Sequence, residues 1–245
     1  HSLLSPYLNN GLLHPSEVID AAMKAFTRGS IPIASCEGFV RQIIGWREYM
    51  RGIYWLKMPE FGKLNFFNHK AQLPQWFWTG NTKMNCLKNT IHQSLDFAYA
   101  HHIQRLMITG NFLLLAGIDP DEVDIWYLGI YIDALEWVEI TNTRGMSQYA
   151  DGGIVGTKPY VSSAAYINKM SNYCTGCHYD YKQKTGSNAC PFNSLYWDFY
   201  NRHEQKLSRN PRIGMSYVTW KKMNPEAKSA ILQQAAYFLQ NINQL

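Results

Sequence analysis

The sequence predicts an all-α fold in a single domain that spans residues 1–245. Three observations support this prediction. Apolar residues recur at helical spacing along several stretches, alternating strand patterns are nearly absent, and no repeat or low-complexity linker divides the chain. The content of 46% apolar and 14% aromatic residues can fill a large core, and 17% charged residues are too few for a disordered chain.

Two helices are expected in the first quarter of the chain. The first follows Pro15 and Ser16, which suit an initial helical turn, and ends at Gly29. The second covers residues 36–58, CEGFVRQIIGWREYMRGIYWLKM, where an apolar stripe runs along one side and charges lie on the other. This pattern predicts one long amphipathic helix.

Four more helices are expected, from Thr90 to Leu115, from Pro120 or Asp121 into Leu135, from Ser162 to Met170, and from Pro225 to Ile242. The last has the clearest signals, because Asn224 can cap it, proline suits its first position, and apolar residues share one face. The stretches 59–90 and 139–162 have the composition of loops. Loops of that length in a compact domain are usually functional or contain unrecognised secondary structure.

The hydropathy and the first residues of the chain indicate whether a membrane span or a signal peptide is to be expected. No stretch approaches the roughly 18–20 uninterrupted apolar residues that a membrane span requires, so a membrane protein is not expected. The chain lacks an initiating methionine and opens on HSLLSPYLNN, without a charged or an apolar leader region. We therefore expect no signal peptide, and we expect the chain to be the downstream part of a longer polypeptide.

The net charge of +5 fits a nucleic-acid-binding protein without requiring one. Region 182–222 concentrates both basic and aromatic side chains, which suits a phosphate backbone with exposed bases. The alternative is a solvated basic face over an aromatic core. The residues concerned are Lys182, Lys184, Arg202, Lys206, Arg209, Arg212, Lys221 and Lys222, with Tyr181, Tyr196, Trp197, Tyr200, Tyr217 and Trp220.

Three of the five cysteines, Cys174, Cys177 and Cys190, lie in one short polar segment. A disulfide framework is not expected in a chain of this size with an odd number of cysteines, so metal binding is the better interpretation. Zinc needs a fourth ligand, and His178 is awkwardly placed beside Cys177. The Cys-Pro step at Cys190 favours an iron–sulfur cluster instead.

The fourth thiolate of such a site has two candidates, Cys36 and Cys86. Cys36 lies at the start of an amphipathic helix and is typical of a core thiol. Cys86 lies in the polar stretch TKMNCLKN, which we expect to be a loop. The sequence favours Cys86 and leaves Cys36 as the alternative.

Three long motifs carry a family resemblance: CEGFVRQIIGWREYMRGIYW, YAHHIQRLMITGNFLLL and GMSQYADGGIVGTKPYVSSAAYINKMSNYCTGCHY. They resemble the photolyase–cryptochrome superfamily, and within it the bacterial iron–sulfur (6-4) photolyases. The resemblance covers nearly the whole chain and corresponds to the carboxy-terminal catalytic half. It implies that an amino-terminal α/β half with an antenna chromophore is absent from this sequence.

The resemblance implies two cofactors. One is FAD held in a helical bundle, and the other is a four-iron, four-sulfur (4Fe-4S) cluster embedded in the same fold. The cluster ligands that it implies are Cys86, Cys174, Cys177 and Cys190, which leaves Cys36 as a structural thiol.

Arg105 lies in an otherwise apolar stretch, and a buried guanidinium needs a partner. Asp133, in the apolar stretch LGIYIDALEW, is the candidate. From the residues alone, such a pair would serve only to fix the packing of helices. The resemblance implies instead that Arg105 and Asp133 flank the isoalloxazine ring and that Glu139 faces flavin N5.

The opening HSLLSPYL is similar to the segment that holds the FAD phosphates in the superfamily, which points to Ser2 and Ser5. Relatives usually carry Thr-Ser-Arg before the Leu-Ser-Pro, so His1 and Leu3 depart from the pattern. Arg47, in GWRE, is a further candidate beside FAD. Its alternative is an exposed helix charge.

Adjacent His101 and His102 point to different faces of one helix, about 100° apart, so we expect only one of them to enter a given pocket. The resemblance assigns His102 as the proton or hydrogen-bond donor to a flipped lesion, with Tyr160 and Tyr166 lining the same pocket. Titration near neutral pH suits histidine to this work.

An electron path to the flavin is also implied by the resemblance. It runs through Trp126 near the flavin, then Tyr127 and Trp78. Most other aromatic residues are expected to serve packing.

The resemblance implies a light-driven DNA repair lyase, a monomeric bacterial cytoplasmic flavoprotein that reverses (6-4) pyrimidine–pyrimidone photoproducts. The lesion in UV-damaged DNA would be flipped out of the duplex, which costs less at a damaged base. Two alternatives stay open. One is a cryptochrome-type blue-light photoreceptor with the same cofactors, and the other is a nonflavin iron–sulfur module that binds nucleic acid and resembles the large subunit of primases.

Overall fold

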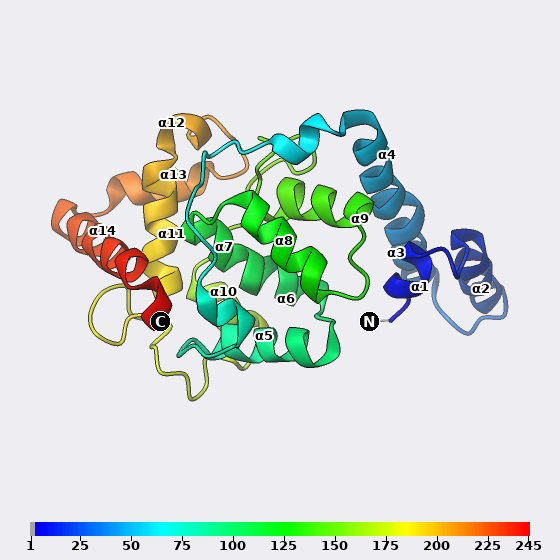
Figure 1. The fold of residues 1–245 in the computed structure, drawn as a ribbon, viewed down its shortest axis with the longest axis horizontal. Helices are drawn as coiled ribbons and strands as arrows, with labels where there is room; N and C mark the ends of the chain where they lie inside the picture. The colour runs from blue at the N-terminus through cyan, green and yellow to red at the C-terminus, as the bar shows by residue number, and fades with distance from the viewer. Residues whose placement is uncertain (1–2) are drawn as a thin grey trace.

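The computed structural model describes residues 3–245, and within that range the chain is helical without an extended strand (Figure 1). Ala71 forms an isolated β-bridge with Ile118, and Asp180 forms another with Ala189. The predicted all-α class is confirmed. Among the helices of residues 3–245, none combines the length and the apolar character that crossing a bilayer demands.

The first helices form one flank of the molecule (Figure 1). They are α1 (Ser5–Asn9), α2 (Pro15–Thr27), α3 (Ile33–Val40), η1 (Arg41–Arg47) and α4 (Glu48–Lys57). Proline opens α2 as predicted, and the Nδ1 atom of His14 accepts a hydrogen bond from the Ser16 N–H. The long helix predicted over residues 36–58 begins earlier, at Ile33, and it changes in its middle to the π-helical segment η1.

The helix predicted from Thr90 to Leu115 is wrong as a single element. Ala98 adopts a left-handed backbone with φ of 50°, and its carbonyl accepts the N–H of Ile132 at 2.9 Å, which ends α5 (Asn85–Phe97). The chain resumes as α6 (His102–Gln104), π-helical η4 (Arg105–Gly110) and α7 (Asn111–Ala116). His101 is therefore the N-cap of α6, and the prediction that His101 and His102 share one continuous helix was wrong.

The two stretches predicted as loops contain short helices. Region 59–90 holds the turns η2 (Glu60–Lys63) and η3 (Gln75–Trp78) and the start of α5, so Cys86 lies in a helical turn rather than a loop. Region 139–162 begins with the end of α9 (Glu136–Ile140) and with π-helical η5 (Thr141–Ser147). Between these regions α8 (Pro120–Ile130) starts at proline as predicted but ends before Leu135.

The carboxy-terminal third forms the opposite flank (Figure 1). Its elements are α10 (Ala164–Met170), α11 (Pro191–Arg202), α12 (Glu204–Leu207), α13 (Gly214–Lys222), α14 (Pro225–Gln240) and η6 (Ile242–Gln244). The predicted cap of α14 is confirmed, because Asn224 Oδ1 accepts the N–H groups of Glu226 and Ala227 at 2.8 and 3.3 Å. Trp197, Tyr200, Tyr217 and Trp220 are buried, so the aromatic residues of region 182–222 form core rather than a stacking surface.

Helix α7 is the centre of the core, since each of its six residues is buried. It packs against α11 on one side and continues from η4 on the other. The segments η4 and η5 approach closely at Gly110. A Cβ atom at this position would lie 2.2 Å from Ser147 Oγ and 2.7 Å from the Arg105 carbonyl oxygen. Only glycine permits that approach.

We predict that Gly110→Ala lowers the free energy of unfolding by about 1–3 kcal/mol, because the added methyl group overpacks the contact between η4 and η5. Gly129→Ala, at an exposed position of α8, is the matched control, since an added Cβ meets no atom within 4 Å there. It should be neutral or stabilising by up to about 1 kcal/mol. Urea denaturation of both variants measures the difference, and equal stabilities would contradict the packing argument.

Candidate functional site

A cavity of about 850 Å³ opens between the amino-terminal helices and the central helices. Its wall combines residues from α1, η1, η4, α9 and η5, and it falls in the size range of small-molecule sites. The three π-helical segments η1, η4 and η5 all contribute to this wall. Segments of π-helix are rare and occur frequently at functional sites, so the cavity is the leading candidate for the active site.

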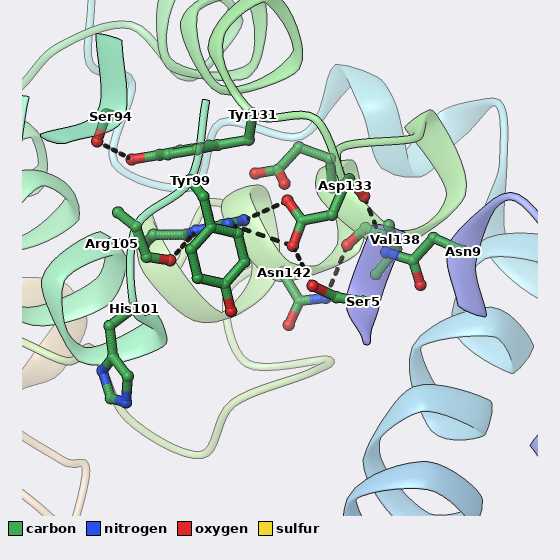
Figure 2. Close-up of polar contacts among 12 residues, drawn as sticks. Ser5, Asn9, Ser94, Tyr99, His101, Arg105, Tyr131, Asp133, Val138 and Asn142 are labelled. Atoms are coloured by element: carbon green, nitrogen blue, oxygen red, sulfur yellow. Dashed lines mark hydrogen bonds and ion pairs between the residues drawn. The ribbon is translucent and has the colours of Figure 1, made fainter. Parts of the chain in front are cut away.

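The predicted pair of Arg105 and Asp133 lies on the wall of the cavity and is confirmed (Figure 2). Both guanidinium Nη atoms of Arg105 donate to the carboxylate of Asp133, at 2.9 and 3.2 Å. Only 16% of the Arg105 side chain and 8% of the Asp133 side chain are exposed. A two-pronged pair of this kind fixes orientation as well as charge.

Two tyrosines that the sequence did not single out hold the guanidinium in place. The Arg105 guanidinium carbon lies 3.9 Å from the ring centre of Tyr131 and 5.1 Å from that of Tyr99, and its Nε donates to the Ala100 carbonyl at 2.8 Å. Burial by itself would lower the pKa of Arg105, but the charge and hydrogen bonds of Asp133 outweigh it and raise this pKa. Arg105 is thus a fixed, permanent cation.

Helix α1 is tied to the same carboxylate. Ser5 Oγ donates to Asp133 Oδ2 at 2.6 Å, and Asn9 Nδ2 donates to the Asp133 carbonyl at 2.8 Å (Figure 2). Both side chains also line the cavity. Ser2, the other serine of the opening segment, lies outside the described residues.

Arg47 lines the cavity from η1. Only 15% of its side chain is exposed, so Arg47 is not the exposed helix charge of the alternative interpretation. Its guanidinium pairs with Glu48, donates to the Leu8 carbonyl at 3.2 Å and lies 5.0 Å from the ring centre of Trp137. The Nε of Arg47 is buried without a hydrogen-bond partner. A donor of this kind is available to a ligand.

Glu139 lies on the cavity wall and is buried. Its Oε1 accepts a hydrogen bond from the Thr143 hydroxyl, which lies one helical turn further along. Burial raises the pKa of Glu139, while the hydrogen bond from Thr143 and the charge of Arg105 act in the opposite direction. Glu139 therefore binds a proton more readily than an exposed glutamate does.

His101 and His102 both line the cavity, at the start of α6, so the expectation that only one of them enters a given pocket was wrong. His101 Nδ1 accepts the Ile103 N–H at 3.1 Å, so this ring caps the helix. The pKa of His102 is lowered, first by desolvation and then by the nearby His101 and Arg105. His102 is consequently neutral near pH 7 and can donate one hydrogen bond there.

The three aromatic residues of the implied electron path are placed in a different order from the expected one. Tyr127, not Trp126, lines the cavity. The ring centres of Trp126 and Tyr127 are 5.3 Å apart, and Trp126 is fully buried. Trp126 Nε1 donates to the Phe77 carbonyl at 3.1 Å, and the next residue, Trp78, is 50% exposed. The three side chains thus extend from the cavity toward the surface.

Tyr160 and Tyr166 lie outside the residues that line the cavity. Both are partly buried against a separate apolar cluster that includes Met107 and Met146. Met146 also contributes to the cavity wall, so the cluster that holds the two tyrosines adjoins the cavity. The expectation that they share one pocket with His102 is not met by this arrangement.

The four cysteines favoured by the sequence come together. Cys86 in the first turn of α5, Cys174 and Cys177 in the turn before residue 180, and Cys190 at the N-cap of α11 line one small cavity. None of the four forms a disulfide. Cys36 lies elsewhere, buried against Ala22 and Met23, as a structural thiol would be.

The cavity that the four cysteines share disfavours the deprotonated, thiolate form of their side chains. Burial raises the pKa of Cys190 to about 12, and the pKa of Cys86 is raised well above its ordinary value by burial and then by the other three cysteines. Within residues 3–245, no three histidine, cysteine, aspartate or glutamate side chains are placed as ligands of a single metal ion. The thiols surround a space instead of converging on one point.

Some site residues left no signal in the sequence. Tyr99 and Tyr131 stack on Arg105, and Asn142 accepts the Trp46 indole N–H at 3.0 Å across the cavity. Each of these contacts joins segments that are distant in sequence, so periodicity does not reveal them. Gln104, which bridges toward the cysteines, was also missed for this reason.

Comparisons with known proteins identify relatives of two kinds. The chain is 55% identical over 243 residues to a (6-4) photolyase from Agrobacterium fabrum, covering 99% of this chain and 48% of that protein. It is 34% and 30% identical to two uncharacterized proteins of Acanthamoeba polyphaga mimivirus, over 45% and 47% of this chain and 82% of each viral protein. No protein-family model matches. The chain spans about half the length of the photolyase.

We predict that Asp133→Ala costs about 3–5 kcal/mol of folding stability, because it leaves the Arg105 cation buried without its partner. Glu37→Ala is the control. It removes a pair with Arg41 in which both side chains are more than half exposed, at 74% and 61%, and it should cost less than about 0.5 kcal/mol. Urea denaturation distinguishes the two, and a cost below about 1 kcal/mol for Asp133→Ala would contradict the importance of the pair.

Proposed function

This chain belongs to the photolyase–cryptochrome superfamily, and on that premise we propose that it is the flavin-binding half of a light-driven (6-4) DNA photolyase. One observation carries the proposal. Ser5, Arg47, Arg105, Asp133 and Glu139, which the resemblance assigns to FAD, all lie on the wall of one cavity of about 850 Å³. Residues 1–245 would act as one helical domain, and an antenna chromophore would belong to the other half.

The polar groups of the cavity fit FAD. The permanent cation of Arg105 suits an electron-rich ring system. The Arg47 Nε, which has no hydrogen-bond partner, suits a phosphate. Glu139, with its raised pKa, can hold or release a proton at the wall of the cavity. Held by these residues in its reduced form, FAD would supply the light-driven donation of an electron to a DNA lesion.

His102 is the residue that would meet the lesion. Its side chain is exposed on the cavity wall, and its neutral ring can donate a hydrogen bond to a base flipped out of UV-damaged DNA. Tyr160 and Tyr166 would support the lesion site through the apolar cluster against which they pack. This assignment gives the two tyrosines a role in shaping the lesion site.

Electrons would reach the cavity through Tyr127, Trp126 and Trp78. The ring contact of Tyr127 with Trp126 supports this route, and so does the hydrogen bond from the Trp126 indole to the carbonyl of Phe77, which directly precedes Trp78. The order differs from the one expected from the sequence, since Tyr127 would be the donor nearest to FAD. The exposed Trp78 would be the entry point at the surface.

Cys86, Cys174, Cys177 and Cys190 fit a 4Fe-4S cluster. Thiolates are the usual ligands of such clusters, and each of the four binds a different iron, so they surround the cluster rather than meet at a single ion. Cys190 is the N-cap of α11, where the helix dipole favours a thiolate. The protein would act without a membrane, as a monomer on DNA.

Removing any one of the four cysteines should abolish the cluster. We predict that Cys86→Ala and Cys190→Ala lose most bound iron and much of the soluble protein, because the binding energy of a structural metal centre contributes to folding. Cys36→Ala should retain iron, since Cys36 lies away from the four cysteines, buried against Ala22 and Met23. Iron analysis and the visible absorption spectrum provide the measurement, and iron retained by Cys86→Ala would remove Cys86 from the site.

We predict that the flavin-reduced protein repairs a (6-4) photoproduct in DNA only under blue or near-ultraviolet light, and that His102→Ala reduces repair per absorbed photon by on the order of 100-fold or more. Lesion affinity and flavin content should change little, since phosphate contacts and stacking supply the binding.

The same assay with a cyclobutane dimer and in the dark serves as the control. Flavin binding without repair of either lesion would favour a photoreceptor, and absence of bound flavin would favour a nonflavin nucleic-acid module. Normal repair by His102→Ala would remove this residue from the chemistry.

A further inference from the structure

The side chain of Gln104 lies between the large cavity and the cysteine site and uses every hydrogen bond that it can form. Its Nε2 donates to Tyr173 Oη and to Gln93 Oε1, both at 3.0 Å. Its Oε1 accepts the His101 N–H at 2.9 Å and Gln93 Nε2 at 3.2 Å. An amide has two donors and an oxygen with two lone pairs, so Gln104 is saturated.

One end of this network belongs to the cysteine site. Tyr173 directly precedes Cys174, and it lines the small cavity that the four cysteines share. Its carbonyl accepts Asn85 Nδ2 at 2.8 Å, and Asn85 directly precedes Cys86. The Tyr173 segment is therefore fixed to two of the four cysteine positions at once.

The other end belongs to the large cavity. The His101 N–H that Gln104 accepts is at the N-cap of α6, immediately before His102 and one turn before Arg105. Figure 2 shows the His101 ring directed away from the pair of Arg105 and Asp133, on the same segment of chain. Helix α6 follows a break at Ala98 and runs directly into η4, so its free end is the first turn, where the His101 N–H needs an acceptor from outside the backbone of the helix.

We propose that Gln104 is a positioning residue that ties the first turn of α6, with His102, to the Tyr173 segment of the cysteine site. Through Gln104 the orientation of His102 in the cavity depends on the cysteine site, although no cysteine touches the large cavity. The inference rests on the proposed function in one respect, because the reaction that it affects is repair of the lesion.

Gln104→Leu removes all four hydrogen bonds while keeping a similar side-chain volume. We expect the His101 amide hydrogen to exchange at least tenfold faster and repair per absorbed photon to fall at least fivefold at saturating lesion. Lesion affinity, iron content and flavin content should stay unchanged. Gln104→Glu should restore more than half of the repair, because its carboxylate can still accept the His101 N–H and the Tyr173 hydroxyl.

Gln234→Leu is the matched control. Gln234 Oε1 accepts the Gly186 N–H at 2.9 Å, so this residue also holds the loop that carries the cysteines, but it holds it to α14 and not to α6. It should leave exchange at His101 and repair unchanged. Tyr173→Phe removes one hydroxyl and should produce a smaller loss than Gln104→Leu, in the same two measurements and with iron retained.

The proposal would be overturned if Gln104→Leu showed the same amide exchange at His101 and the same repair as the wild-type protein. It would also be overturned if Gln104→Leu and Gln234→Leu had equal effects. If Gln104→Leu does not fold, unchanged exchange and repair in Tyr173→Phe would overturn it instead. A wild-type protein that repairs no lesion would refute the proposed function alone, because amide exchange at His101 still tests the link.

Discussion

The cavity depends on one buried ion pair. Removing Arg105 and Asp133 from water costs free energy that is recovered only when both partners meet in good geometry. Their meeting brings together η4, the turn after α8 and, through Ser5 and Asn9, helix α1. The amino-terminal helices also hydrogen-bond to the centre through Trp46, Tyr49 and Tyr54, so the pair acts together with these contacts in placing one wall of the cavity relative to the other.

The segment from His101 to Gly110 contributes to both candidate sites. Its cavity side presents His102 and Arg105, and its opposite side reaches Tyr173 through Gln104. The aromatic series from Tyr127 to Trp78 leaves the cavity from another element, α8, and is separate from the cysteines. The Tyr127 hydroxyl is hydrogen-bonded to Thr109 and to the Arg105 carbonyl, so the proposed electron route and the proposed link between the two sites meet at this segment.

Local signals in the sequence predicted the features that neighbouring residues determine. Asn224 and Pro225 fixed the start of α14, and a charged residue in each of two apolar stretches was enough to pair Arg105 with Asp133. Features that depend on distant segments were missed. The left-handed turn at Ala98 is held by Ile132, and the stacking of Tyr131 on Arg105 likewise joins residues that no local pattern relates. Because this turn was missed, His101 was wrongly expected inside one continuous helix.

The π-helical segments have a consequence for how this chain tolerates insertion and deletion. A hydrogen bond from residue i to i+5 encloses one residue more than an α-helical bond, so each segment stores an extra residue relative to a regular helix. Deleting one residue from η5 would therefore permit a regular α-helix with little rotation of the residues beyond the deletion, whereas the same deletion from a regular α-helix would rotate them by about 100°. Related chains should therefore differ by one-residue gaps within the three segments more readily than within the regular helices that flank them.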